Sequence, residues 1–293
     1  MTALTPIGVL AHPLRPQTAP VAEQITRYLQ ARGRQAWCCT HWDDQQIKDR
    51  VAASAMVIAI GGDGAMLRAA RVCSFYEVPV LGINMGQLGF LTEIDGPESW
   101  EHPLETVLGG NYWIEERMMI RAELLRDGLV AASGDALNDV VISRKIATRM
   151  IWLETYIDKD WATTYNADAL IVATATGSTA YALACGGPIL PPELHNILIV
   201  PVAPHLSMNR PLVLSEGATV EVVAARDNYA EMVLTLDGVF IDDVVPGDTI
   251  RVYASPYVSR FVRVRGRNYF YRSLLDRLEP RVQVRAEPEH KQI

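Results

Sequence analysis

The sequence predicts an α/β fold in two parts: an N-terminal domain with a parallel, Rossmann-like sheet and a mostly β C-terminal domain. Strand-like and helix-like runs alternate near the N-terminus, β-type runs take over near Arg117, and Asp-Gly or Gly-Asp turns separate the later runs. A chain of 293 residues is long enough for two hydrophobic cores. We place the domains at residues 1–116 and 117–267, followed by a C-terminal helix and tail at 268–293.

The N-terminal elements follow from the spacing of apolar residues. Ile7 to Ala11 is a continuous apolar run, which predicts a buried strand, and a helical period follows it and ends before Gly33. Met56 to Ile60 and Pro79 to Ile83 predict two further strands. The first helix contains Val21, Ile25, Tyr28 and Leu29, and a helix between the last two strands contains Met66, Leu67 and Ala70. Such alternation predicts a doubly wound parallel sheet.

The second half of the chain contains closely spaced runs of β-branched and aromatic residues. Turn signals at Asp127-Gly128, Asp237-Gly238 and Gly247-Asp248 separate some of them, which favours a mostly β domain. The predicted strands are Ile120 to Leu125, Asp139 to Ser143, Ile151 to Ile157, Ala169 to Ala173, Ile197 to Val202, Thr219 to Ala224, Met232 to Leu236 and Thr249 to Tyr253. Tyr269 to Leu278 predicts a final helix, and we expect residues 279–293 to fray.

Composition excludes several classes of function. A net charge of −7 argues against broad electrostatic capture of nucleic acid. The longest apolar runs fall far short of the roughly 20 residues of a membrane-spanning helix, and the N-terminus lacks the features of a signal peptide. The four cysteines have neither zinc-site spacing nor the density of a disulfide scaffold, so we expect reduced core thiols. We therefore expect a cytoplasmic protein that binds neither nucleic acid nor membrane.

The first motif with chemical potential is Gly61-Gly62-Asp63-Gly64, which lies between a predicted strand and a predicted helix. Glycines at such a turn let the backbone approach a phosphate chain, and the N–H groups of the next helix point toward it. A carboxylate beside phosphate is unfavourable unless a metal or a hydroxyl lies between them, so Asp63 indicates a general base or a metal contact. By itself the motif favours an ordinary tight Asp-Gly turn. It matches neither the P-loop nor the G-x-G-x-x-G pattern.

The second motif is Asn138-Asp139, directly before a predicted strand. An amide beside a carboxylate offers hydrogen-bond donors and acceptors that suit an adenine edge and a ribose diol. Taken alone, the pair favours an ordinary Asx turn that enters a strand.

The third motif runs from Tyr165 to Tyr181 and ends at Gly186-Gly187-Pro188. It predicts a strand, a polar loop and a helix of about two turns that is capped by Ser178. Tyr181 is suited to stacking on a base. Four hydroxyl side chains gather at the predicted helix entrance, which suits hydrogen bonds to sugar and phosphate oxygens: Thr174, Thr176, Ser178 and Thr179.

These motifs, in this order, resemble those of NAD kinases. Two further segments strengthen the resemblance, Leu88-Gly89-Phe90-Leu91-Thr92-Glu93 and Pro204-His205-Leu206-Ser207-Met208-Asn209-Arg210-Pro211. The resemblance spans roughly Ile7 to Leu278, and a match of five ordered segments is far more specific than any one motif. The resemblance implies an active site in the crevice between the two domains and transfer of a phosphoryl group from ATP or polyphosphate to the 2′-hydroxyl of the adenosine ribose of NAD.

The resemblance also implies roles for individual residues. Asp63 would be the general base, and Asn138 would hold the adenosine part of NAD. The expected NAD-binding residues are Gly64, Leu67, Phe90, Asn138, Asp139, Asp168, Thr179, Ala180 and Tyr181, with Asp168 toward the nicotinamide. The expected donor-phosphate residues are Gly61, Gly62, Gly64 and Arg68. We expect Mg²⁺ held mainly by the donor's phosphates, with no dedicated protein metal site, and a homo-oligomer, either a dimer or a tetramer.

The chain departs from the family pattern at three places, and two other functions stay open at this point. Ala65 stands where the family usually has Thr, Asp139 where it has Glu, and Ala167 and Ala169 where it has Gly. A lipid or sphingoid-base kinase shares the Gly-Gly-Asp-Gly loop, although no amphipathic basic helix is present for a membrane surface. A non-catalytic dinucleotide sensor would explain the departures but would not need Asp63.

Overall fold

The computed structural model describes residues 4–278 except 41, 43–44, 87–88 and 147–148. Its N-terminal half contains four parallel strands in the order β2-β1-β3-β4. They are β1 (Ile7–Ala11), β2 (Ala36–Cys39), β3 (Met56–Ile60) and β4 (Val80–Ile83). The predicted strands at 7–11, 56–60 and 79–83 are confirmed. β2 was not predicted: its four residues are short for a strand signal, contain no β-branched residue and are mostly half-buried at the sheet edge.

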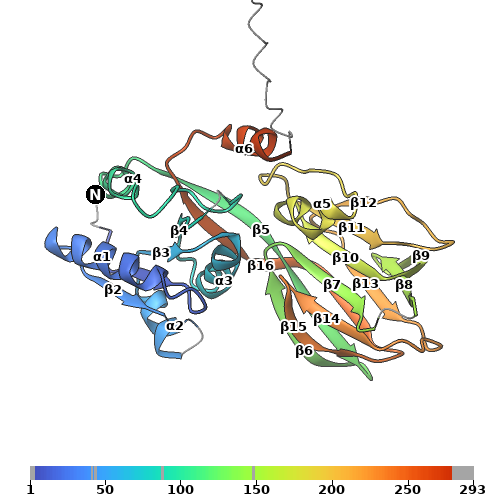
Figure 1. Ribbon diagram of the computed structural model, residues 1–293. Coiled ribbons are helices and arrows are strands. Elements are labelled where there is room, and N and C mark those ends of the chain that lie inside the picture. The colour runs from blue at the N-terminus through green and yellow to red at the C-terminus, as the bar shows by residue number, and fades with distance from the viewer. Residues whose placement is uncertain (1–3, 41, 43–44, 87–88, 147–148, 279–293) are drawn as a thin grey trace, which may run out of the picture.

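Helices cover both faces of this parallel sheet (Figure 1). Val9 packs with residues of two helices and Leu10 packs with residues of two others, because successive side chains of a strand point to opposite faces. A strand buried on both faces requires a continuous apolar run, which β1 has. On the Val9 face are α1 (Thr18–Ala31) and α4 (Glu101–Leu108), and on the Leu10 face are α2 (Gln45–Ala52) and α3 (Asp63–Ser74).

The C-terminal half is an antiparallel sandwich of two sheets. A hydrophobic core lies between them and contains apolar residues from both. One sheet has the order β12-β11-β10-β7-β14-β15, and the other contains β5, β6, β8, β9, β13 and β16. The bounds of the first sheet are β7 (Asp139–Arg144), β10 (Ala169–Thr174), β11 (Asn196–Val202), β12 (Leu212–Ser215), β14 (Met232–Leu236) and β15 (Val239–Val244). Those of the second are β5 (Trp113–Arg126), β6 (Leu129–Ala136), β8 (Ile151–Ile157), β9 (Asp160–Ala167), β13 (Val220–Ala224) and β16 (Thr249–Arg263).

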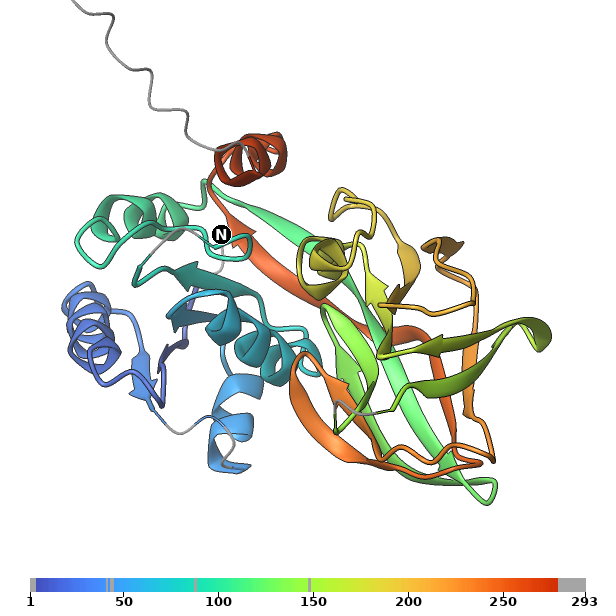
Figure 2. The same ribbon diagram turned by 45° about the vertical axis from the view of Figure 1, so that its right-hand side comes forward.

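Two long strands join the halves. β5 and β16 pair antiparallel from Trp113 opposite Arg263 to Leu125 opposite Thr249, and Phe261 of β16 also pairs with Val80 of β4. One ten-stranded sheet therefore runs through both halves (Figures 1 and 2). The domain boundary placed between residues 116 and 117 falls inside β5, and these boundaries remain a prediction.

The last described helix is α6 (Tyr269–Leu278), as predicted. It lies above the junction of the two halves in Figures 1 and 2. Among the described helices, none combines the length and the apolar character needed to cross a membrane.

Candidate active site

Asp63 is the first residue of α3, directly after the turn that leaves β3. Gly61 in this turn has φ +154°, and a β-carbon there would lie 2.6 Å from the β-carbon of Ala65. Glycine is therefore required at Gly61 for both conformation and space. The helix begins with Gly62 as its N-cap residue, so the free N–H groups of α3 face the same region as the Asp63 side chain.

The backbone of a distant segment fixes the Asp63 carboxylate. The Phe90 N–H donates to its Oδ2 at 2.8 Å, and the Leu91 N–H donates to its Oδ1 at 2.9 Å. Gly89 lies so close that a β-carbon there would stand 1.9 Å from Oδ1. The structure thus brings together two of the segments on which the family resemblance rests. Leu88, which belongs to the second of them, lies outside the described residues.

The Asn138-Asp139 turn is organised by Asp237, a residue that the sequence analysis treated only as part of a turn. The Asp237 carboxylate accepts three successive backbone N–H groups, from Leu137 at 2.9 Å, Asn138 at 2.7 Å and Asp139 at 3.2 Å. Asp237 has a positive φ of 48°, a conformation that aspartate tolerates better than most residues. The Asp-Gly pair was the available signal, but nothing in the sequence shows which loop it contacts.

Two carboxyl groups share this buried turn. Burial, together with the nearby Asp237 carboxylate, raises the pKa of Asp139 to about 7. Burial also raises the pKa of Asp237, and it outweighs the opposing effect of the three N–H donors and of Arg71 on α3. Near neutral pH, Asp139 is therefore divided between its protonated and ionised forms.

The third motif packs directly against the second. After β10 the chain forms the 3₁₀ turn η1 (Thr176–Thr179) and the short helix α5 (Tyr181–Ala184). A β-carbon on Gly177 would lie 2.1 Å from the carbonyl oxygen of Asn138, so only glycine allows this contact. The same carbonyl oxygen accepts the N–H of Thr174 at 2.9 Å.

Two expectations for the third motif are wrong. Ser178 does not cap a helix: it lies inside η1, and its hydroxyl donates to the Leu190 carbonyl oxygen at 3.2 Å and accepts the Leu190 N–H at 2.9 Å. The predicted two-turn helix is the single turn α5, which begins after Ala180 without a side-chain cap. Ser178 therefore connects η1 to the backbone of Leu190 and does not begin a helix.

Three of the gathered hydroxyls form hydrogen bonds within the protein. Thr174 donates to the Leu137 carbonyl oxygen at 2.5 Å, and Thr179 donates to that of Thr176 at 3.2 Å. Together with Ser178, they bond to protein atoms and fasten the turn. These hydrogen bonds fix the backbone of the loop between β10 and α5.

Two of the predicted residues on the C-terminal half, Asp168 and Asp139, lie near Tyr181. This side chain is 44% exposed, and burial of the remainder raises the pKa of its hydroxyl, with smaller contributions from Cys185, Asp168 and Asp139. The Asp168 carboxylate forms an ion pair with Arg144 at 2.6 Å. Tyr181 therefore presents an accessible ring beside two acidic side chains.

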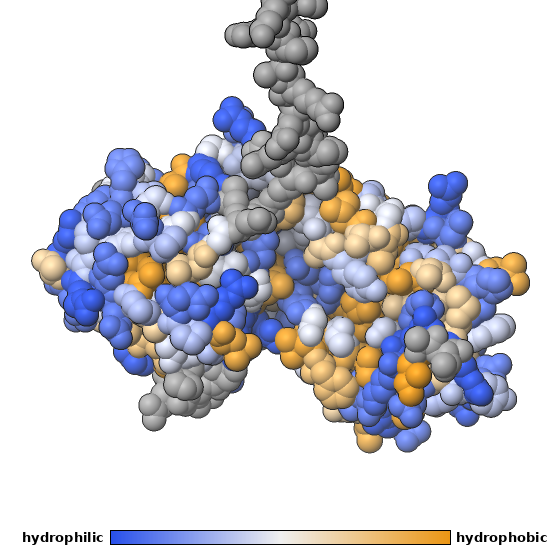
Figure 3. All heavy atoms as spheres, in the orientation of Figure 1, coloured by the Kyte–Doolittle hydropathy of each residue, from blue (hydrophilic) through white to orange (hydrophobic). Residues whose placement is uncertain are grey.

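The three motifs meet where the two halves pack. Leu137, next to Asn138, belongs to the same buried cluster as Met66 on α3 and Leu91. Leu67 is half-buried against that cluster, and Arg68 is half-buried with its guanidinium 5.7 Å from the ring of Trp42. Figure 3 shows the molecule hollowed between its two halves. The predicted crevice lies between the two halves, and Met66 of α3 and Leu137 beside Asn138 pack together in this region.

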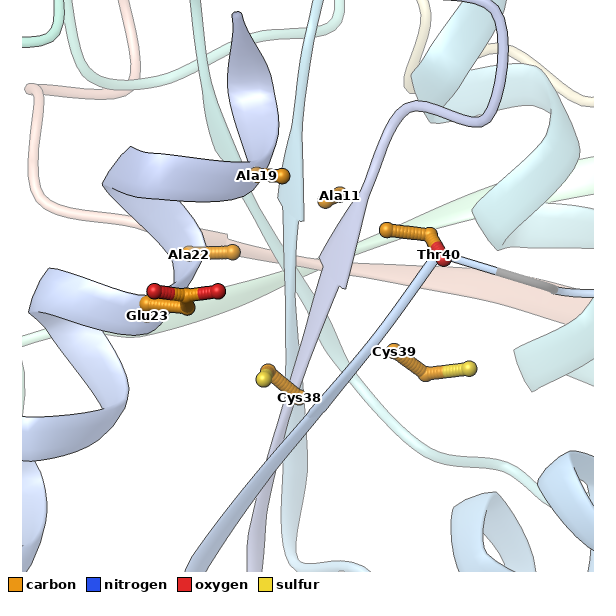
Figure 4. A pocket seen from close by; sticks show the side chains of 7 residues that line it. All are labelled: Ala11, Ala19, Ala22, Glu23, Cys38, Cys39 and Thr40. Carbon is orange, nitrogen blue, oxygen red and sulfur yellow. The ribbon is translucent and has the colours of Figure 1, made fainter. Parts of the chain in front are cut away.

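A separate cavity of about 300 Å³ lies on the N-terminal half, at the carboxyl ends of β1 and β2 beside α1 (Figure 4). Small side chains and thiols line most of it: Ala11, Ala19, Ala22, Glu23, Cys38, Cys39 and Thr40. None of the predicted site residues lines this cavity. Within the described ranges, no three or more His, Cys, Asp or Glu side chains are grouped so that they could hold a metal ion.

Comparison with known proteins gives matches along most of the chain. The family model of the ATP-NAD kinase N-terminal domain matches residues 35–112, and that of the ATP-NAD kinase C-terminal domain matches residues 137–264. An NAD kinase of Chloroflexus aggregans is 41% identical over 275 residues, which are 93% of this chain and 98% of that protein. An NAD kinase of Dehalococcoides mccartyi is 36% identical over 274 residues, 93% of this chain and 95% of that one.

Solved structures show the same fold at lower sequence identity. A yeast NADH kinase complexed with NADH matches with a TM-score of 0.80 at 20% identity, covering 99% of this chain and 91% of that one. An NAD kinase from Archaeoglobus fulgidus in complex with ATP matches with a TM-score of 0.73 at 22% identity, covering 92% of this chain and 98% of that one.

Proposed function

The chain belongs to the ATP-NAD kinase family, and we propose that Asp63 is the general base with which it phosphorylates NAD. It is an NAD kinase: it transfers a phosphoryl group from ATP to NAD and forms NADP. The proton of the ribose 2′-hydroxyl passes to the Asp63 carboxylate while the hydroxyl oxygen bonds to the γ-phosphorus. The bond from that phosphorus to its bridging oxygen breaks, and ADP leaves.

The observation that carries this proposal is the pair of N–H donors from Phe90 and Leu91 to the Asp63 carboxylate. Each carboxylate oxygen has a further lone pair that can accept a hydroxyl proton. Because two backbone groups fix the carboxylate, its position does not depend on the arrival of substrate, and such preorganisation is what a general base requires.

The NAD pocket that we propose combines residues from both halves. Leu67, Phe90 and Gly64 come from the N-terminal half, and Asn138, Asp139, Asp168, Thr179, Ala180 and Tyr181 come from the C-terminal half. The contact of Gly177 with Asn138 supports this assignment, because it holds the two C-terminal segments against each other. The exposed ring of Tyr181 is suited to stacking on a base of the dinucleotide.

The donor phosphates bind, in this proposal, at the Gly61-Gly62-Asp63-Gly64 turn and Arg68. In the part of the chain that the structure describes, no atom lies within 4 Å of the place where a β-carbon of Gly62 or Gly64 would stand, which leaves the backbone open to a phosphate chain. We propose that Mg²⁺ is bound mainly by the donor's phosphates and water, since a hard cation prefers oxygen ligands and a triphosphate supplies them. Bound there, the ion offsets the phosphate charge during transfer.

We further propose a homo-oligomer that acts in the cytoplasm. Exposed aromatic side chains on two adjacent strands support the homo-oligomer, because exposed apolar surface is typical of protein–protein contacts. Trp152 on β8 is 49% exposed and Trp161 on β9 is 63% exposed. None of the four cysteines forms a disulfide, which accords with a reducing compartment. Light scattering of the purified protein tests the oligomer: a monomer at micromolar concentration would contradict it.

The test of the proposed base is the substitution Asp63→Asn. Asparagine keeps the size of the side chain and accepts one of the two backbone N–H groups with its carbonyl oxygen, while its NH2 group faces the other, and it does not act as a carboxylate base. We expect NADP formation to fall by about 10² to 10⁴ in kcat, with NAD binding close to that of the unaltered enzyme and a small fall in melting temperature from the lost hydrogen bond. Near-unaltered turnover would remove Asp63 from the mechanism.

The same assay addresses the two alternatives raised by the sequence. NAD binding without NADP formation by the unaltered protein, at saturating ATP and magnesium, would identify a dinucleotide sensor. Phosphorylation of a lipid extract would identify a lipid kinase, although both matched family models are those of ATP-NAD kinases.

A further inference from the structure

A buried network of charged side chains lies behind the Asp63 site, where β5 and β16 cross from one half to the other. Arg263 is fully buried, and Glu115, Arg117 and Glu93 are at most 4% exposed. The charges of Arg117 and Arg263 hold the pKa of Glu115 below its ordinary value, although burial alone would raise it. Burial of so many charges costs several kcal/mol per ion unless geometry and hydrogen bonding compensate, so the contacts of each charged group decide what the network does.

The Arg263 guanidinium is held from two sides. Its Nε donates to Glu115 Oε2 at 2.8 Å, and its Nη1 lies 3.2 Å from Glu93 Oε2. Glu115 is in turn fixed by the Tyr269 hydroxyl of α6, which donates to its Oε1 at 2.8 Å. The guanidinium is therefore immobilised by two carboxylates that are themselves anchored.

Arg263 also reaches the segment that orients Asp63. Its Nη1 donates to the carbonyl oxygen of Leu91 at 2.9 Å, while the N–H of Leu91 donates to the Asp63 carboxylate. Leu91 is thus fixed at both of its backbone polar groups. Leu91 is the single residue between Arg263 and the Asp63 carboxylate. Any shift of Leu91 moves one of the two N–H donors that position this carboxylate.

We propose that Arg263 is a positioning residue for phosphoryl transfer, which holds Leu91 in the place where its N–H orients the Asp63 carboxylate. This inference rests on the proposed role of Asp63 as the base. Arginine is required because its planar fork serves Glu115, Glu93 and the Leu91 carbonyl at once, whereas a lysine ammonium keeps the charge but has a single nitrogen.

Arg265, two residues further along, provides a matched control. Its Nε contacts Glu93 Oε2 at 3.2 Å, and its Nη2 donates to the carbonyl oxygen of Thr92. It shares a carboxylate with Arg263 and binds the neighbouring carbonyl, but it does not contact Leu91 in the described hydrogen bonds. Arg263→Lys removes an arginine of the network together with the Leu91 contact, whereas Arg265→Lys removes an arginine of the network and leaves that contact in place. A comparison of the two variants therefore isolates the effect of the Leu91 contact.

The experiment is a double-mutant cycle with Asp63→Asn and Arg263→Lys, with Arg265→Lys as the control. A misplacement of the order of 1 Å near the reacting group can cost up to about 100-fold in rate. We therefore expect Arg263→Lys to lower kcat between about 10- and 100-fold, with the KM for NAD nearly unchanged, and Arg265→Lys to change kcat by less than about threefold. In the Asp63→Asn background, Arg263→Lys should cost less than about threefold, because two residues that act through one group are not additive.

Equal losses from Arg263→Lys in both backgrounds, or an equal loss from Arg265→Lys, would overturn the positioning role and leave the base intact. Near-unaltered turnover of Asp63→Asn would overturn the base itself. Should Arg263→Lys not fold, Glu115→Gln loosens the guanidinium with less loss of packing. We expect the same fall in kcat and the same non-additivity with Asp63→Asn, and additive losses would count against the proposal.

Discussion

The backbone N–H of Asp237 donates to the carbonyl oxygen of Asp139 at 2.9 Å, while the Asp237 carboxylate accepts the N–H of Asp139 at 3.2 Å. This reciprocal contact joins the turn after β14 to the turn before β7. It also places two carboxyl groups in a region from which water is largely excluded, since Asp139 is only 6% exposed. The interaction holds Asn138 in place at the cost of burying charge beside charge.

The raised pKa of Asp139 predicts a pH-dependent stability. Its ordinary value in an unfolded chain is about 3.9, and its value in the folded protein is about 7. Between these values the folded state binds a proton that the unfolded state has lost, so stability from this group falls as pH rises from about 4 to about 7 and is level above that. For Asp139→Asn we expect stability relative to the unaltered protein to rise over that window, by at most about 1.4 kcal/mol per pH unit.

Urea unfolding at several pH values between 5 and 8 measures this difference. Asp227→Asn removes the same charge at an exposed position and serves as the control. A difference for Asp139→Asn that does not change with pH would show that Asp139 is ionised throughout the range.

The position of Gly89 predicts that a single added methyl group slows the enzyme. In Gly89→Ala the new β-carbon would stand 1.9 Å from Asp63 Oδ1, so the carboxylate or the 89–91 backbone must move. We expect kcat to fall about 10- to 100-fold, by the same misplacement argument. Gly86→Ala is the control, because no atom of the described residues lies within 4 Å of its added carbon. Similar kcat values for both variants would show that the position of Asp63 is not critical.

Tyr181 is expected to contribute to binding more than to the rate of transfer. An aromatic wall contacts the dinucleotide equally in the ground state and the transition state, so Tyr181→Ala should raise the KM for NAD and leave kcat nearly intact. Tyr181→Phe keeps the ring and should keep the KM. A steady-state comparison of the two variants checks this, and a large fall in kcat at unchanged KM would assign Tyr181 a different role.

Activity should require a divalent cation. The chain has no P-loop lysine to offset the charge of the triphosphate, so we expect an excess of chelator to abolish NADP formation and added magnesium to restore it. The melting temperature in the absence of nucleotide should not change with the chelator, because we place the ion on the donor rather than on the protein. Full turnover in the chelator would contradict this prediction.

The sequence alone determined the fold class, most elements and the identity of the motifs. Ile7 to Ala11 and Met56 to Ile60 are recognisable as buried strands because a strand packed on both faces must be apolar throughout. Gly61 and Gly177 belong to recognisable motifs because neighbouring atoms lie too close to their α-carbons for any side chain to fit. Such local requirements are written in consecutive residues, so they can be read without a structure.

Only the tertiary structure decided which distant groups meet. The donors to Asp63 are the backbone N–H groups of Phe90 and Leu91, and a backbone group carries no sequence signal. Asp237 organises the Asn138 turn from almost a hundred residues away, and the hydroxyls of Thr174, Ser178 and Thr179 turned out to bond the protein itself. The partner of a polar group is chosen by packing across the whole molecule, and the same serine or aspartate suits a ligand, a cap or a loop equally well until packing selects one.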